Sequence, residues 1–137
     1  MPLDLNSNIK IAPSIYPTNS GAATIDSAST AVDTKGYHSA MVAVAVGAAS
    51  GTPDTQSVIF TVQKDTASAF SSATTVSTFT AITADNGSAT VHIPNLGTAQ
   101  ERYLRVKAVI AFTGGSSPAI EVAANVILGT PDVAPVS

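Results

Sequence analysis

Cysteine and tryptophan are absent from this 137-residue chain, and charged residues make up only 11% of it. Without cysteine, the chain has no disulfide and no thiolate for catalysis or metal binding. Ordinary soluble domains contain about 25% charged residues, so small, weakly hydrated groups dominate this surface. Because so little charge protects a monomer poorly against association, we expect much of the surface to be covered in the working state.

Positive charge is scarce as well, since six Lys and Arg against nine Asp and Glu give a net charge of −3. A nucleic-acid binder would need a larger basic patch, so we expect no nucleic-acid partner. The most apolar runs, 41–49 and 123–129, are far shorter than the roughly 20 residues of a membrane-spanning helix, so we expect no membrane partner. The first residues lack the basic start and apolar run of a secretory signal, which indicates a protein made in the cytoplasm.

Short runs with a two-residue alternation recur along the chain, separated by Gly, Pro, Asn and Asp, which favour turns. We expect strands at 21–27, 37–48, 56–64, 73–82 and 88–93, with inward side chains that include Val42, Val44, Val46, Val58, Phe60 and Val62. No stretch indicates a convincing helix. The pattern predicts an all-β fold, a single antiparallel β-sandwich or jelly roll of about 7–8 strands.

The N-terminal run is extended but contains Pro13 and Pro17, which cannot donate a hydrogen bond to a strand ladder and belong at an edge or in an arm. We therefore expect residues 1–18 to form an extended N-terminal arm. Residues 19–130 are predicted to form the β-sandwich domain, and residues 131–137 a flexible C-terminal tail.

The strongest strand pattern covers residues 101–129, which we predict to be one long β-hairpin with its turn at 114–117. Alternation places five apolar side chains on its inward face, namely Leu104, Val106, Ala108, Ile110 and Phe112. The outward face begins with Tyr103, Arg105 and Lys107. This polar stripe has two interpretations of equal weight, a solvated sheet face or a surface that contacts another protein.

Residue types that carry chemistry are few and scattered. His38 and His92 have no second ligand at metal-binding spacing, and we interpret them as surface residues. Asp54, Asp65 and Asp85 stand at turns, where carboxylates commonly accept local backbone hydrogen bonds. The sequence therefore predicts no catalytic residue, no metal site and no cofactor, and we expect the protein not to be an enzyme.

Two segments resemble the small cement, or decoration, proteins of tailed-bacteriophage heads. The first is Phe60–Asp65 followed by Ala69-Phe70-Ser71-Ser72, and the second is Glu101–Val106 with the apolar strand, the Gly-rich turn and the final strand to Gly129. Together they cover about the last two-thirds of the chain. Residues 1–18 have no counterpart that we can match.

The resemblance implies a jelly-roll-like β-sandwich on the exterior of an icosahedral virion, assembled in the host cytoplasm. It also implies that the protein bridges neighbouring subunits of the major capsid protein as a small homo-oligomer, a dimer ahead of a trimer. We predict protein contacts at eight residues: Ile9, Ile11, Ile15, Tyr16, Arg102, Tyr103, Arg105 and Lys107. The alternative hypothesis is a carbohydrate- or receptor-binding β-sandwich module of a phage fibre or surface protein, which the lack of aromatic platforms makes less favourable.

Overall fold

The computed structural model describes residues 4–26, 31–94, 96 and 102–131. In this part of the chain one helical turn precedes nine strands, and none of its helices is long and apolar enough to cross a membrane. The elements are α1 (Leu5–Asn8), β1 (Lys10–Ser20), β2 (Ala23–Ile25), β3 (Val32–Asp33), β4 (Tyr37–Val46), β5 (Thr55–Asp65), β6 (Thr74–Thr78), β7 (Ser88–Ile93), β8 (Tyr103–Thr113) and β9 (Ile120–Pro131).

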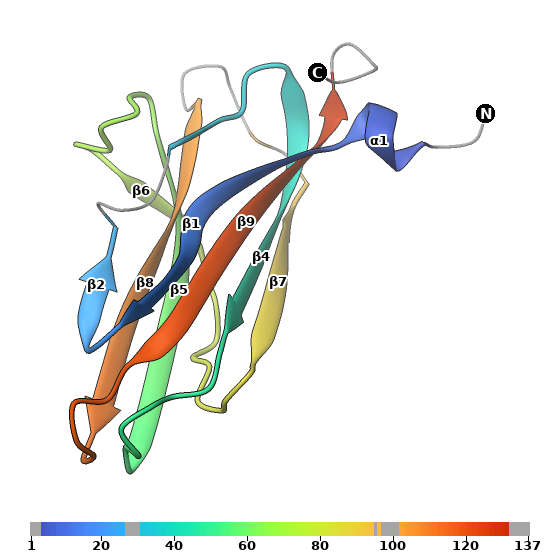
Figure 1. Ribbon diagram of the computed structural model, residues 1–137. Coiled ribbons are helices and arrows are strands. Elements are labelled where there is room, and N and C mark those ends of the chain that lie inside the picture. The colour runs from blue at the N-terminus through green and yellow to red at the C-terminus, as the bar shows by residue number, and fades with distance from the viewer. Residues whose placement is uncertain (1–3, 27–30, 95, 97–101, 132–137) are drawn as a thin grey trace.

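The strands form two antiparallel sheets that pack face to face (Figure 1). Sheet A has the strand order β1-β9-β4-β7. Sheet B has the order β2-β8-β5-β6, and the short strand β3 also pairs with β8, so β2 and β3 share one position at the sheet edge. The fold is therefore an all-β sandwich with eight strand positions, as the sequence predicts.

The pairing is nested, which identifies the topology. The first strand pairs with the last, β2 and β3 pair with β8, β4 pairs with β7, and β5 pairs with β6. A single long hairpin rolled up on itself has this pattern, and the rolling adds the pairs β4·β9 and β5·β8. The arrangement is a jelly roll, with consecutive strands mostly in opposite sheets.

The core lies between the sheets and consists of the inward side chains of both. Alternation along the strands buries every second residue, so that Val42, Phe60, Val106 and Val126 are fully enclosed. The rings of Phe60 and Phe79 meet edge to face, with centroids 6.3 Å apart. The predicted inward positions of β4, β5 and β8 are confirmed, with Phe112 only partly buried at the margin.

The hairpin predicted at residues 101–129 is wrong. β8 pairs with strands of sheet B, whereas β9 pairs with β1 and β4 of sheet A, so the connection crosses from one sheet to the other. Gly114 and Gly115, which have positive φ angles of 68° and 80°, make this crossing. Alternation identified the inward face of β8 correctly, but it does not say which sheet a strand joins.

The prediction of a separate arm is also wrong for most of its length. Lys10–Ser20 is β1, which pairs with β9 and forms an edge of sheet A. Pro13 and Pro17 lie on this edge, as expected for residues without an N–H, and the pairing shifts register on both sides of Ile15. The segment before it is not extended either, because the carboxylate of Asp4 accepts hydrogen bonds at the start of α1. Residues 1–3 and 132–137 lie outside the described part of the chain.

At the first register shift of β1, the side chain of Ser14 points into the protein interior. Its hydroxyl oxygen accepts a hydrogen bond of 2.8 Å from the backbone N–H of Val106, in the part of β8 that lies between its pairings with β2 and β3. β1 is thus bonded to β9 through its backbone and to sheet B through one side chain, which closes this side of the sandwich.

Candidate contact surfaces

An apolar row crosses the outer face of sheet A. Ile11 of β1 stands opposite Ile127 of β9, and Ile127 stands opposite Met41 of β4, so three large side chains lie side by side on neighbouring strands. Ile11 is 59% exposed and Met41 is 39% exposed, while Ile127 between them is half-buried. We call these three residues the apolar row.

The rest of this outer face is almost free of formal charge. His92 of β7 stands opposite Met41 at the edge of the sheet, and the neighbouring outward positions are small or uncharged: Pro13, Ala43, Ala45, Thr90, Ala123 and Asn125. Lys10 and Glu121 are the two formally charged residues of the four strands, and they lie near opposite ends of sheet A. The centre of the face can therefore be covered without removing an ion from water.

The outer face of sheet B carries the predicted polar stripe in a different environment. Tyr103, Arg105 and Lys107 project outward from β8 and are all half-buried. The guanidinium of Arg105 donates a 2.9 Å hydrogen bond from Nε to the side-chain oxygen of Gln63 and lies 4.6 Å from the ring centroid of Phe70. Arg105 thus holds β5 and the following loop against β8.

The loop after β5 is closed by a carboxylate. Asp65 accepts backbone hydrogen bonds from Thr66 at 2.6 Å and from Ser72 at 2.8 Å, and the bond from Ser72 is the main cause that lowers the pKa of Asp65 below its ordinary value. Phe70 adopts a positive φ of 53° within this loop and is buried against Arg105. Asp65 and the segment Ala69-Phe70-Ser71-Ser72 therefore close this loop on itself.

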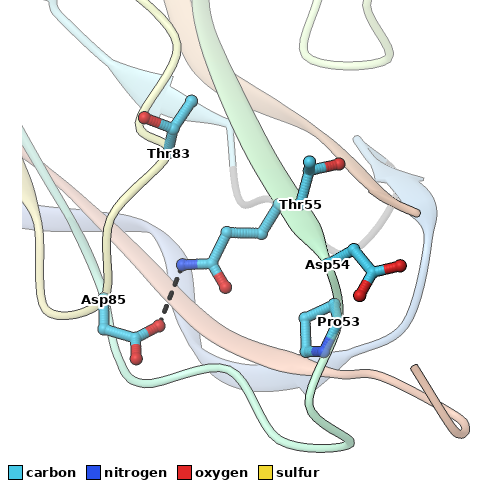
Figure 2. A pocket seen from close by; sticks show the side chains of 6 residues that line it. Pro53, Asp54, Thr55, Thr83 and Asp85 are labelled. Carbon is cyan, nitrogen blue, oxygen red and sulfur yellow. Dashed lines mark hydrogen bonds between the residues drawn. The ribbon is translucent and has the colours of Figure 1, made fainter. Parts of the chain in front are cut away.

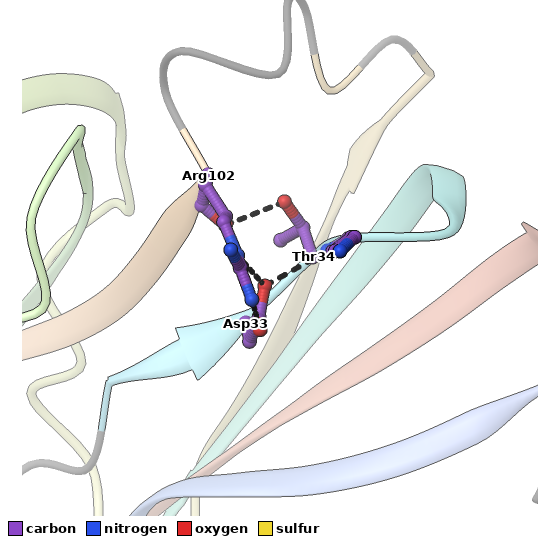
Figure 3. Close-up of polar contacts among 4 residues, drawn as sticks. Asp33, Thr34 and Arg102 are labelled. Atoms are coloured by element: carbon purple, nitrogen blue, oxygen red, sulfur yellow. Dashed lines mark hydrogen bonds and ion pairs between the residues drawn. The ribbon is translucent and has the colours of Figure 1, made fainter.

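Arg102 anchors β3 beside the start of β8 (Figure 3). Its Nε donates to the Asp33 carboxylate at 2.6 Å, and its terminal nitrogen forms an ion pair with the same carboxylate. The backbone carbonyl of Arg102 accepts a 2.6 Å hydrogen bond from the Thr34 hydroxyl. The hydrogen bond from Arg102 lowers the pKa of Asp33, and that bond in turn raises the pKa of Arg102.

A polar pocket of about 250 Å³ opens at the end of the sandwich beside the start of β5 (Figure 2). Its lining includes the carboxylates of Asp54 and Asp85 and the amide of Gln56. Asp85 accepts hydrogen bonds from the backbone N–H of Ala49 at 3.0 Å, the main cause of its lowered pKa, and from Gln56 at 2.9 Å. Within the described residues no group of three or more His, Asp or Glu side chains could hold a metal ion.

The predicted contact residues do not form one surface. Those of the N-terminal segment lie at the end of α1 or in sheet A. Arg102 directly precedes β8, and Tyr103, Arg105 and Lys107 belong to β8 of sheet B, whose outer face is on the other side of the sandwich. Ile11 and Tyr16 are well exposed and Ile9 is half-buried at the end of α1. Ile15 is 2% exposed and is part of the core, which is a correction to its prediction as a contact.

The predicted contact residues do not include two members of the apolar row. Met41 and Ile127 are large apolar residues at outward positions, each between two buried neighbours on its strand. That alternation could have indicated both as surface residues. Their alignment with Ile11 depends on the pairing of β1, β9 and β4, which are far apart in sequence.

No model of a known protein family matches the chain, and no curated protein sequence matches it. Among solved structures, one titled Desmodium yellow mottle tymovirus shares 11% identity with a TM-score of 0.38, over 100% of this chain and 95% of that one. A family two carbohydrate esterase from Cellvibrio japonicus shares 11% identity with a TM-score of 0.28, over 96% of this chain. The match spans 36% of the esterase chain. Both TM-scores are low, so the topology rests on the strand pairing of this chain.

Proposed function

We propose that this protein is a non-enzymatic structural component of a virion, which binds the exterior of an icosahedral phage capsid and joins neighbouring subunits of the major capsid protein. The observation that carries the proposal is the outer face of sheet A, whose four strands contain formal charge only at Lys10 and Glu121 and which the apolar row crosses. The jelly-roll topology and the resemblance of residues 60–72 and 101–129 to cement proteins support the same conclusion.

The size of this face suits a stable protein contact. Strands about 4.8 Å apart with a rise of roughly 3.4 Å per residue give sheet A an area of about 540 Å² over the length of β4, because β1 and β7 accompany β4 over only part of that length. A standard protein interface buries about 800 Å² on each partner. The face therefore accounts for most of one such interface, before any loop contributes.

Cementing needs many modest contacts rather than one very strong one. A protein that touches two capsid subunits gains from effective concentration, because the first contact holds the second surface within reach. Burial of the apolar row contributes favourably through the hydrophobic effect. On the other face of the sandwich, the half-buried Lys107 supplies a positive charge for an acidic partner.

The experiment compares binding of two variants to expanded capsids that lack the protein. Met41→Lys places a charge in the apolar row, whereas Ile59→Lys places the same charge on the outer face of sheet B at a residue of nearly equal exposure, 39% against 36%. We expect wild type and Ile59→Lys to co-sediment with capsids and raise their thermal stability. Met41→Lys should remain folded and lose most of this binding.

Two results would contradict the proposal. If wild-type protein does not bind such capsids, or binds without raising the temperature at which they break, the cementing function is wrong. If Met41→Lys binds as well as Ile59→Lys, the outer face of sheet A is not the contact surface.

The pocket between Asp54 and Asp85 is the observation that favours the carbohydrate-binding alternative. Two carboxylates and an amide in one depression can hydrogen-bond to sugar hydroxyls. A glycan array tests this directly. Specific binding that is lost in Asp54→Asn, together with no capsid binding by the wild type, would replace the structural function by recognition of a glycan.

A further inference from the structure

The edges of the two sheets differ in how they are protected against pairing with another chain. β1 carries Pro13 and Pro17 together with two register shifts. β2 and β3 have three and two residues, and the pairing of β6 with β5 contains a register shift. Prolines, irregular pairing and short length are the devices by which natural sheets block their edges.

β7 has none of these devices. Ser88–Ile93 contains no proline, no glycine and no formal charge, and it pairs with β4 in continuous register over all six residues. Among the described strands β4 is its single neighbour, so β7 is the outer edge of sheet A (Figure 1). An open and regular edge of this kind is a template for another strand.

The hydrogen-bond pattern shows which groups of β7 face outward. The N–H of Val46 donates to the carbonyl of Gly87, and the N–H of Gly47 donates to Glu121 in β9, so alternate residues of β4 bond to β7 and to β9. In an antiparallel ladder this alternation directs the N–H and C=O groups of Ser88, Thr90 and His92 away from β4. The side chains of these three residues are also exposed.

We infer that β7 pairs with β7 of a second copy of this chain about a two-fold axis, which joins two copies of sheet A into one continuous eight-stranded sheet. A two-fold axis perpendicular to the sheet keeps outward residues opposite outward residues. The register centred on Thr90 places the two Thr90 residues opposite each other and Ser88 opposite His92 of the second copy. It forms roughly six backbone hydrogen bonds and leaves Pro94, which has no N–H, outside the ladder.

Charge supports a second copy as the occupant of this edge. Identical strands place like charges close together wherever a charge occurs, and β7 has no Asp, Glu, Lys or Arg. The half-buried Ala89 and Val91 would meet their counterparts on the inward side of the joint sheet. The pairing therefore buries apolar groups and satisfies backbone groups without opposing charges.

The same arrangement explains why association stops at two copies. After pairing, the outer edges of the joint sheet are the two β1 strands, which Pro13 and Pro17 block. Two-fold pairing through one shared surface is closed, whereas head-to-tail pairing would continue into a fibre. The inference concerns the isolated chain and does not depend on capsid binding.

Light scattering on purified protein tests the inference with three variants. We expect the wild type to have twice the 13.7 kDa mass of the chain, and Thr90→Lys, which brings two ammonium groups together at the centre, to have the mass of one chain. Thr78→Lys makes the same change at an exposed threonine of β6, the edge of sheet B, and should remain dimeric. Thr90→Pro removes an N–H that faces away from β4 and should also be monomeric.

Amide hydrogen exchange gives a second measurement that does not need a variant. The amides of Ser88, Thr90 and His92 should exchange more slowly as the concentration of wild-type protein rises, while the other amides of β7 are protected at every concentration by β4. A wild type that stays monomeric at millimolar concentration overturns the inference. So does a dimer that persists in folded Thr90→Lys and Thr90→Pro, or one that is lost in Thr78→Lys alone.

Discussion

The hydroxyl oxygen of Ser14, on β1 of sheet A, accepts a hydrogen bond from the backbone N–H of Val106, on β8 of sheet B. Ser14 has no exposed surface, so this bond replaces water for a buried backbone group. In the gap between β2 and β3, the Ser14 side chain thereby supplies the hydrogen-bond acceptor that the backbone of a longer edge strand would supply.

Ser14→Ala should lower the free energy of unfolding by about 1–3 kcal/mol, because it leaves the N–H of Val106 buried without an acceptor. Urea denaturation measures the change. Ser39→Ala is the control, since its hydroxyl bonds to the exposed hydroxyl of Thr130 and its loss should cost within about 0.5 kcal/mol. Equal effects of the two substitutions would show that Ser14 has no special part in closing the sandwich.

Phe60→Ala should destabilise the protein by about 3–5 kcal/mol, because it removes a fully buried ring and its edge-to-face contact with Phe79. Ile59 is the next residue on β5 but points outward and is 36% exposed. Ile59→Ala should therefore cost much less, about 1 kcal/mol or below. Thermal or urea unfolding of both variants checks which face of β5 is buried. A larger loss of stability in Ile59→Ala than in Phe60→Ala would contradict the assignment of Phe60 to the inward face.

Gly51→Ala should destabilise more than Gly36→Ala, although both glycines have positive φ, 79° and 90°. Left-handed backbone costs a non-glycine residue roughly 1–2 kcal/mol, and this cost is common to both sites. A Cβ on Gly36 meets open space, whereas one on Gly51 lies 2.8 Å from Cα of Pro118. We expect overpacking to add about 1–3 kcal/mol at Gly51, as measured by denaturation; equal losses would exclude close packing of these loops.

Stability should decrease at acid pH in part through Asp65. The pKa of Asp65 is lowered in the folded state, chiefly by the N–H of Ser72, so its carboxylate stabilises the fold above the unfolded-state pKa of about 3.9. That contribution is lost as the pH falls through the lower folded-state pKa. Urea unfolding at a series of pH values should show a steeper acid decline in wild type than in Asp65→Asn. Parallel declines would exclude this role for Asp65.

Much of the fold follows from local patterns in the sequence. Alternation identified the inward residues of β4, β5 and β8, because the side-chain period of a strand depends only on its own residues. Both ends of β7, Ser88 and Ile93, lie where the sequence predicts them. The one-turn helix at Leu5–Asn8 and the two-residue strand at Val32–Asp33 carry too few residues for any period to show.

The remaining features depend on which strands meet, and no local pattern carries that information. β8 and β9 each have the alternation of a hairpin strand, yet they belong to different sheets, because β8 pairs with β5 along its whole length while β9 pairs with β1 and β4. The apolar row brings Ile11, Met41 and Ile127 together only through the registers of β1 and β4 with β9. The inward turn of Ser14 follows from a bulge that sequence alternation does not reveal.

The nested pairing of the strands also sets an order in which the chain can fold. Lys10 pairs with Leu128, and Ile15 pairs with Ala124, so the outermost ladder joins the two ends of the described chain. Nearly the whole polypeptide must therefore have left the ribosome before this ladder can form. Folds dominated by such distant contacts acquire their native structure in milliseconds to seconds rather than microseconds. Until β9 has been synthesised, β1 lacks its partner strand in sheet A and β4 lacks one of its two neighbours, so their apolar residues stay exposed.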